Sequence, residues 1–252
     1  MTTDLTSHDF AGQIAIITGA ASGIGHAIAT HLAERGARIA GVDIASGLDE
    51  AVAALPGAGH LPVSADISDA DAASEAVSRV TTELGAPHVL VNSAGIGRFA
   101  PGEQVPAKDW QATLAVNLSG SFFMAQAAGR AMLEAGYGRI VSIASQAAEI
   151  GLAEHAAYSA SKAGILGFTR VLAVEWASRG VTVNAVSPTI VDTALAREIW
   201  VGEKGAKARE EIPAGRFADP GEVASLVAFL AGRDAAMITG ENVRVDGGRS
   251  VI

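Results

Sequence analysis

Short apolar runs alternate along the chain with longer stretches in which apolar residues recur at helical spacing. A short apolar run is typical of a buried strand, and helical spacing of apolar residues is typical of an amphipathic helix. We expect strands at residues 13–18, 38–42, 61–64, 89–91, 139–143, 181–186 and 242–245. We expect helices at residues 26–35, 49–55, 69–84, 106–134, 155–178 and 220–231.

Two helix-prone stretches contain interruptions. The stretch 106–134 should break at the polar residues 117–121, and residues 193–211 contain Gly202 and Gly205. We therefore expect a mobile segment after residue 193, within a substrate lid at about residues 189–213. The alternation of strands and helices predicts a single α/β domain, residues 1–252, in which helices cover both faces of a parallel sheet.

Composition narrows the class of protein. The chain is 49% hydrophobic but only 5% aromatic, and its formal charge of −9 argues against nucleic acid as a partner. It has no cysteine, and its six histidines show no ligand-like spacing, so we assign no metal. Residues 1–10 lack the features of a signal peptide, and no apolar run reaches the ~18 residues of a membrane span. We expect a soluble, cytoplasmic protein that binds no membrane.

A glycine-rich turn follows the first predicted strand. Gly19, Gly23 and Gly25 are spaced slightly more widely than the usual dinucleotide fingerprint, but they lie between an apolar strand and a helix. Glycines there let the backbone approach a pyrophosphate, and the helix N-terminus supplies free N–H groups. Asp43, which ends the second strand, can accept hydrogen bonds from ribose hydroxyls and would repel a 2′-phosphate. The pattern favours NAD over NADP, unless Asp43 is only a solvated turn residue.

Tyr158 and Lys162 are four residues apart in a predicted helix, so both side chains lie on one face. An ammonium beside a phenol favours the phenolate, and a tyrosine with a lowered pKa can act as an acid or base near neutral pH. The alternative is an ordinary exposed ion-dipole pair on the helix surface. The pair predicts chemistry only in combination with the other motifs.

The combination of motifs resembles the short-chain dehydrogenase/reductase family from Gln13 to Gly248. The matching features are Thr-Gly-Ala-Ala-Ser-Gly-Ile-Gly at 18–25, Asn-Ser-Ala-Gly at 92–95, Asn117, Ser145 and the pair Tyr158 and Lys162. The resemblance implies a doubly wound Rossmann-type domain with a seven-stranded parallel sheet. It also implies hydride transfer between a nicotinamide and an alcohol or carbonyl, and a homotetramer.

The resemblance also implies a role for each matching residue. Tyr158 is the general base in oxidation and the acid in reduction, while Lys162 lowers its pKa and holds the nicotinamide ribose. Ser145 hydrogen-bonds the substrate oxygen, and Asn117 holds a water that leads protons to Lys162. The cofactor contacts implied are Gly19, Ser22, Gly23, Ile24 and Gly25 at the pyrophosphate, Asp43, Asp66, Ile67, Asn92, Ala94 and Gly95 toward the adenosine, and Val191 and Thr193 at the carboxamide.

Softer features resemble those of bacterial NAD-dependent polyol dehydrogenases acting on threitol, diols and sugar alcohols. A small polyol needs several polar groups around a small pocket. Gln146 and His155, beside Ser145 and Tyr158, can supply them, and Trp200 can close over the substrate. The alternatives are a solvated His155 and a Trp200 used in packing or subunit contact. Thr189 stands where glycine is usual after proline, which is a departure that can narrow the nicotinamide end of the pocket.

Two other functions compete with a polyol dehydrogenase. One is a 3-oxoacyl-thioester or other ketone reductase of the same family, whose acidic carrier protein would need a basic patch that the acidic sequence does not reveal. The other is a nucleotide-binding sensor or scaffold without catalysis. Such a protein has no physical need for Tyr158 and Lys162 together.

Overall fold

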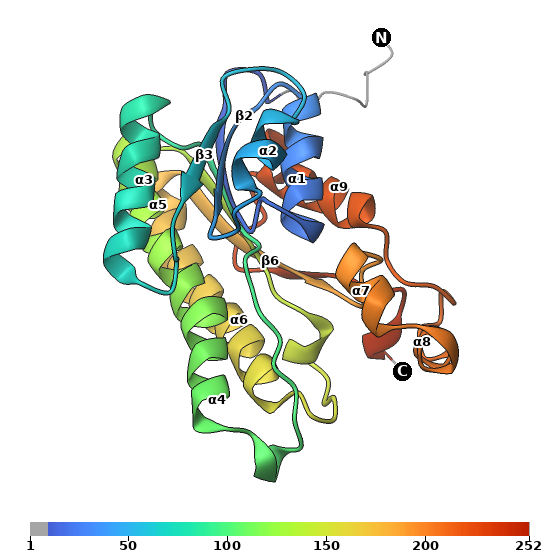
Figure 1. The fold of residues 1–252 in the computed structure, drawn as a ribbon. Coiled ribbons are helices and arrows are strands. Elements are labelled where there is room, and N and C mark those ends of the chain that lie inside the picture. Colours follow the sequence, from blue (N-terminus) through green and yellow to red (C-terminus); the bar gives the residue numbers. More distant parts are fainter. Residues whose placement is uncertain (1–9, 252) are drawn as a thin grey trace.

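Seven parallel strands form one continuous sheet at the centre of the protein (Figure 1). The computed structural model describes residues 10–251, so the predictions for residues 1–9 lie outside it. The strand order is β3-β2-β1-β4-β5-β6-β7, which confirms the predicted doubly wound sheet. The strands are β1 (Ile14–Thr18), β2 (Arg38–Asp43), β3 (Leu61–Ser64), β4 (Val89–Asn92), β5 (Gly138–Ile143), β6 (Val181–Pro188) and β7 (Asn242–Val245).

Helices cover both faces of this sheet (Figure 1). One face carries α1 (Gly23–Glu34), α2 (Leu48–Ala53) and α9 (Pro220–Ala231). The opposite face carries α3 (Ala70–Glu83), α5 (Ser121–Ala135) and α6 (Ala156–Trp176). The two apolar layers contain aliphatic side chains almost throughout, because the strands are buried on both faces and few aromatic residues are available.

Local sequence signals account for several helix ends. The predicted cap Asp69 accepts a hydrogen bond from the Ala72 N–H at 2.8 Å and so begins α3. Gly36 has φ of +92° and donates its N–H to the Ala33 carbonyl, which ends α1 as predicted. These ends confirm the helix positions expected from the sequence on either side of β2 and β3.

The predicted break at residues 117–121 is a change of helix type instead. The chain passes from α4 (Ala107–Leu114) through a π-helical turn (Ala115–Gly120) directly into α5. Asn117 is fully buried, so its polar side chain points inward rather than toward solvent. Because the segment has internal partners for its polar groups, the helix is not interrupted there.

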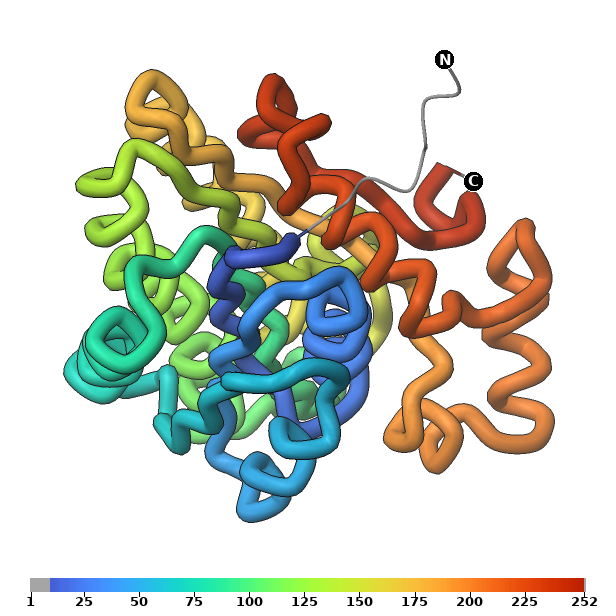
Figure 2. The backbone as a smooth tube through the Cα atoms, turned by 90° about the horizontal axis from the view of Figure 1, so that it is seen from above, coloured from blue at the N-terminus to red at the C-terminus, as the bar shows by residue number. Residues whose placement is uncertain are grey.

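The predicted mobile segment contains two short helices, α7 (Ala194–Ile199) and α8 (Gly202–Glu210). They lie beside the body of the molecule, away from the sheet (Figures 1 and 2). The helices separate at Trp200 and Val201, just before Gly202, whereas Gly205 lies inside α8. Movement of this segment as a lid stays a prediction.

All seven strands end at the same edge of the sheet because they run parallel. The chain leaves β1 and β4 toward opposite faces, and ligands of open α/β sheets bind at such a switch point. In residues 10–251 no helix is both long and apolar enough to cross a membrane.

Candidate active site

The glycine-rich turn lies between β1 and α1 and is more tightly folded than any other residue type would allow. Gly19 has φ of +71° and Gly23 has φ of +58°. A Cβ atom at Gly25 would lie 2.2 Å from the Gly19 carbonyl oxygen, and one at Gly19 would lie 3.0 Å from the Ala94 backbone nitrogen. The bare backbone at the start of α1 fits a dinucleotide pyrophosphate, which binds to free N–H groups at a helix N-terminus.

Asp43 lies at the end of β2 beside this turn. One carboxylate oxygen accepts the Ala21 N–H at 3.1 Å, and the other accepts the N–H groups of Ile44 and Ala45. Asp43 is therefore not a freely solvated turn residue. Its carboxylate is held at the position where a ribose hydroxyl binds in dinucleotide folds, which is compatible with the predicted contact.

The segment after β4 approaches the same turn. The Thr18 hydroxyl oxygen accepts hydrogen bonds from the N–H groups of Ser93 and Ala94, both at 3.0 Å. A Cβ atom at Gly95 would lie 3.2 Å from the Asn117 side-chain oxygen and 3.6 Å from the Lys162 nitrogen. The backbone at Gly95 thus lies next to both predicted catalytic side chains.

Tyr158 and Lys162 occupy the first turns of α6, as the sequence predicts. Lys162 is only 4% exposed, so the alternative of an ordinary surface pair is wrong. Its Nζ donates a hydrogen bond of 2.7 Å to the Ile143 carbonyl at the end of β5 and lies 5.7 Å from the centroid of the Tyr158 ring. No carboxylate of residues 10–251 forms an ion pair with Lys162. Burial of such a lysine is costly, and strongly perturbed groups of this kind are often functional.

Burial controls the ionisation of both groups. It lowers the pKa of Lys162 to about 8, since a buried ammonium loses its hydration. Burial also raises the pKa of Tyr158, and the hydrogen bond from Ser145 only partly opposes this effect. The predicted lowering of the Tyr158 pKa is therefore wrong for the chain alone, because the loss of hydration exceeds the effect of the Ser145 hydrogen bond.

Ser145 lies directly after β5, where it begins a short 3-10 turn (Gln146–Ala148). Its hydroxyl oxygen accepts the Ala147 N–H at 3.1 Å, and its hydrogen bond to Tyr158 directs the hydroxyl toward the phenol. Gln146 is buried, and within residues 10–251 its side-chain oxygen has no hydrogen-bond partner. Ser142, three residues earlier in β5, accepts a hydrogen bond from the Asn92 side-chain amide and is part of the core.

Asn117 connects three parts of the site from its π-helical turn. Its side-chain oxygen accepts the Ile96 N–H at 2.8 Å, and its amide donates to the Ile96 carbonyl and to the Ser161 hydroxyl oxygen. The Ser161 hydroxyl donates in turn to the Tyr158 carbonyl at 2.7 Å. Sequence reasoning missed Ser161, although its position three residues after Tyr158 on the same helix face offered a signal.

The remaining predicted cofactor residues lie on segments near the glycine-rich turn, and some of their side chains bond within the protein. Asn92 is buried, and its amide donates to the Ser121 carbonyl and the Ser142 hydroxyl, so its side chain is used inside the protein. Thr193 caps α7, and its methyl group would lie 3.8 Å from a Cβ atom at Gly23. The others lie on the adjoining segments: Ser22 and Ile24 at the start of α1, Asp66 and Ile67 after β3, and Val191 after β6.

Two of the predicted substrate residues lie in different surroundings. His155 precedes α6 and contacts Tyr158 through its ring, with centroids 6.1 Å apart. Trp200 packs instead against Phe217 and Lys204, which supports its alternative role in packing. Sequence reasoning missed Phe99, whose ring contacts both His155 and Tyr158. Its loop has no periodic pattern, and only its position after β4 offered a signal.

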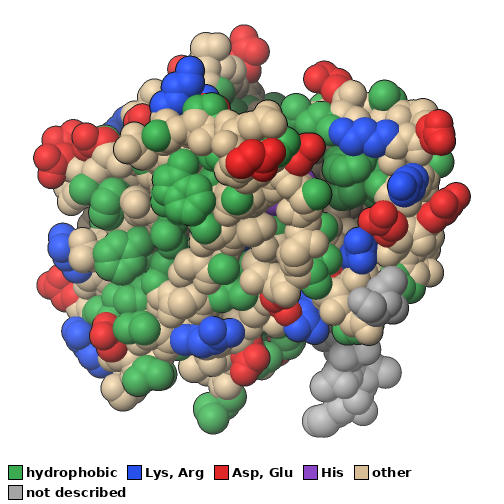
Figure 3. Space-filling model, turned by 90° about the horizontal axis from the view of Figure 1, so that it is seen from below, with side chains coloured by type: hydrophobic (Ala, Val, Ile, Leu, Met, Phe, Trp, Pro, Cys, Tyr) green, Lys and Arg blue, Asp and Glu red, His purple; other side chains and the backbone are tan. Residues whose placement is uncertain are grey.

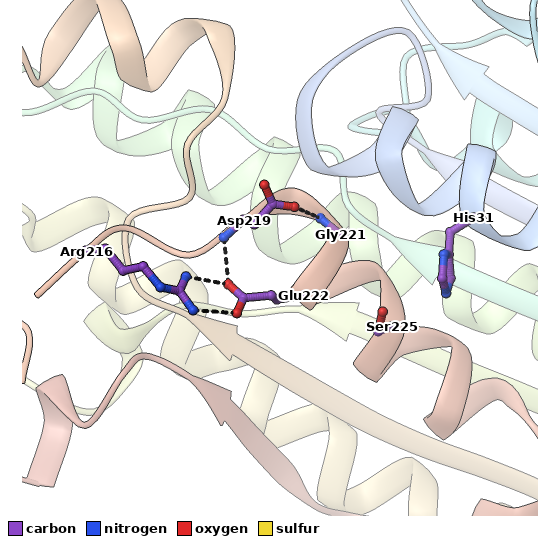
Figure 4. Close-up of a pocket in the computed structure, with 6 residues that line it drawn as sticks. All are labelled: His31, Arg216, Asp219, Gly221, Glu222 and Ser225. Atoms are coloured by element: carbon purple, nitrogen blue, oxygen red, sulfur yellow. Dashed lines mark hydrogen bonds and ion pairs between the residues drawn. The ribbon is translucent and has the colours of Figure 1, made fainter. Parts of the chain in front are cut away.

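A surface pocket between α1 and α9 is a separate feature (Figure 4). There, Arg216 holds Glu222 in a bidentate ion pair and the pKa of that carboxyl falls to about 2. Asp219 caps the first turn of α9 through the Gly221 N–H. These groups stabilise the start of α9. Its lining residues are His31, Arg216, Asp219, Gly221, Glu222 and Ser225.

The glycine-rich turn, the held carboxylate and the pair of partly buried Tyr158 and buried Lys162 define the class of nicotinamide-dependent oxidoreductases. Residues 19–250 match a family model described as enoyl-(acyl carrier protein) reductase. The D-threitol dehydrogenase of Mycolicibacterium smegmatis is 49% identical, over 95% of this chain and 94% of that protein. The NAD-dependent glycerol dehydrogenase of Listeria innocua is 41% identical over the same shares of the two chains.

Solved structures agree with the sequence matches. A Beutenbergia cavernae structure, described as an NAD(P)-dependent gluconate 5-dehydrogenase with bound NADP at low occupancy, superposes with a TM-score of 0.91. It is 38% identical and covers 97% of this chain and 99% of its own. The chain belongs to the short-chain dehydrogenase/reductase family.

Proposed function

We propose that the protein is an NAD-dependent dehydrogenase of small polyols or related secondary alcohols. The observation that carries the proposal is the buried contact of Tyr158 with Lys162 and Ser145 beside a dinucleotide turn. The relatives named for threitol and glycerol, at 49% and 41% identity, support a polyol as substrate. Buried polar atoms without partners in residues 10–251, at Gln146 next to Ser145 and at Thr189 just after β6, offer further hydrogen-bonding groups.

The side chains divide the reaction between them. Ser145 donates its hydroxyl proton to the substrate oxygen when substrate binds, and the Tyr158 oxygen removes the proton of the reacting hydroxyl. A bound oxidised nicotinamide supplies the acceptor for the hydride that leaves the carbinol carbon, together with a positive charge that favours the phenolate. Lys162 would hold the nicotinamide ribose and pass protons from the phenol toward Asn117. The side chains of Lys162 and Asn117 both lie beside the backbone of Gly95.

The preference for NAD rests on Asp43. A carboxylate held by the Ala21 N–H repels a phosphate at the ribose 2′ position and accepts hydrogen bonds from unmodified hydroxyls. The name of the glycerol dehydrogenase supports this preference, whereas the structural relative with bound NADP shows that the family uses both cofactors.

The test is a substrate panel at alkaline pH with NAD. Four- to six-carbon sugar alcohols and vicinal diols should give NADH, measured by absorbance, and Tyr158→Phe should abolish its formation while NAD still binds. No NADH from any member, together with reduction of 3-oxoacyl thioesters, would assign the protein to the rival 3-oxoacyl-thioester reductases, some of which are 37% identical to this chain. Near-normal turnover by Tyr158→Phe would overturn the catalytic assignment itself.

We also propose a homotetramer, as the family resemblance implies. Val171 and Val174 on α6 are 54% and 83% exposed, and an apolar helix face of this kind supports burial against another copy. Light scattering coupled to gel filtration should give four times the chain mass of 25.4 kDa. A monomer would refute this proposal.

A further inference from the structure

Three rings meet at the catalytic tyrosine. The centroids of Phe99 and His155 are 4.2 Å apart, and those of Phe99 and Tyr158 are 5.8 Å apart. Phe99 is nevertheless 48% exposed. Figure 3 views this end of the molecule and shows hydrophobic side chains gathered over part of it. A large apolar ring that stays open to solvent beside a catalytic group is available to a substrate.

The backbone holds Phe99 in this position. A Cβ atom at Gly97 would lie 2.5 Å from the Phe99 ring, so only glycine leaves room for the ring to fold back over its own loop. The Ala100 N–H donates to the Glu154 carbonyl and ties this loop to the one before α6. Glu154 has φ of +67°, the only positive φ at a non-glycine residue in 10–251. Such strained backbone often occurs at ligand sites.

The same loop determines the tautomer of His155. Its Nδ1 lies 2.6 Å from the Ala153 carbonyl oxygen, and a carbonyl can only accept, so Nδ1 carries the proton. With the Nδ1 proton held in this way, Nε2 is the ring atom that can accept a hydrogen bond, and none of the hydrogen bonds described for residues 10–251 uses it. A hydroxyl group on a ligand is a suitable donor to it.

We propose that Phe99 is a specificity-determining residue that selects substrates with a second hydroxyl. It holds the His155 ring so that Nε2 accepts a hydrogen bond from a hydroxyl other than the one Tyr158 deprotonates. The ligand class is a small alcohol with at least two hydroxyls on a short carbon chain. This inference rests on the proposed function, since it concerns the same reaction.

The test compares butane-2,3-diol with butan-2-ol, which lacks the second hydroxyl. Phe99→Leu should lower kcat/KM for the diol by up to about tenfold through KM, because an aromatic contact of this kind is worth about that factor. Turnover of the monool should change by less than about twofold. Phe99→Tyr keeps the ring and should keep the diol preference. Gly97→Ala should displace the ring and lower the diol preference. The control is Met237→Ala, which removes a side chain that is 95% exposed and should leave the preference unchanged.

A double-mutant cycle makes the mechanism specific. If Phe99 acts through His155, then His155→Ala should lower the diol preference by itself, and adding Phe99→Leu to it should lower the preference no further. Additive losses, or a preference unchanged in Phe99→Leu, would overturn the inference while leaving the proposed function intact. Failure of the wild-type protein to oxidise these two alcohols and every sugar alcohol and diol of the panel would overturn both.

Discussion

Replacing Lys162 by methionine should destroy activity and stabilise the protein. Folding takes the Lys162 ammonium out of water, and the pKa falls from 10.5 to about 8 as a result. A difference of about 2.5 pKa units corresponds to about 3 kcal/mol at neutral pH. Methionine is also unbranched, so it fills nearly the same space without a charge.

One hydrogen bond reduces the expected gain. The Ile143 carbonyl accepts from Lys162 Nζ at 2.7 Å, and the variant leaves this carbonyl without that donor. A buried acceptor left without its donor costs about 1–3 kcal/mol. The free energy of unfolding at pH 7 should therefore rise by up to about 2 kcal/mol, while turnover falls by at least about a hundredfold because the phenol loses its neighbouring cation.

The pH dependence of the free energy of unfolding tests separately whether Lys162 destabilises the folded protein. Because the folded-state pKa of Lys162 is lowered, the unfolded chain binds more protons between pH 8 and 10.5, and wild-type stability gains from rising pH in that window. The advantage of the variant should shrink to nearly nothing by about pH 9.5. Urea unfolding followed by circular dichroism at pH 7 and 9.5 measures both values, with the exposed Lys108→Met as control. A variant less stable than wild type at pH 7 would refute the reasoning.

Three further variants probe the remainder of the site. Asp43→Ala should weaken NAD about tenfold or more and relax discrimination against NADP, with Asp43→Asn also relaxing it; an unchanged ratio of affinities would exclude a contact with the ribose. Gly25→Ala should abolish NAD binding in titration calorimetry and destabilise the fold by about 1–3 kcal/mol, because its Cβ would meet the Gly19 carbonyl, whereas Gly47→Ala, with open space around it, should do neither. Glu149 follows the turn after Ser145 and accepts hydrogen bonds from Asn242 and Arg244 on β7. Glu149→Gln should therefore lower kcat by up to about tenfold with little change in NAD affinity. An unchanged kcat would show that these hydrogen bonds do not position Ser145.

The sequence was informative wherever the relevant signal is local. The strands follow from short apolar runs, and the pairing of Tyr158 with Lys162 on one face follows from the period of a helix. The glycine-rich turn could be located because only glycine tolerates its backbone angles and close approaches. In each case a few neighbouring residues carry all the information needed.

Features that depend on the surrounding structure could not be predicted in this way. The direction of the Tyr158 pKa shift depends on how deeply other segments bury the phenol, and its sequence neighbour Lys162 suggested the opposite sign. Phe99 contacts His155 across 56 positions of the chain, through an irregular loop with no periodic pattern. Trp200 is a large aromatic residue that could cover a substrate, but its ring packs against Phe217.

The π-helical turn illustrates how a local irregularity becomes useful through distant partners. A π turn departs from the regular hydrogen bonds of the helix, and the Ser121 hydroxyl compensates by donating to the Asn117 carbonyl at 2.8 Å. The side chain of Asn117 is then directed inward, where it holds Ile96 after β4 and Ser161 on α6. Because Ser161 also holds the Tyr158 carbonyl, one buried amide joins the loop beside the cofactor turn to the helix that carries the catalytic pair. An exposed or helix-breaking asparagine could do neither, so the irregular turn and the catalytic geometry are parts of one arrangement.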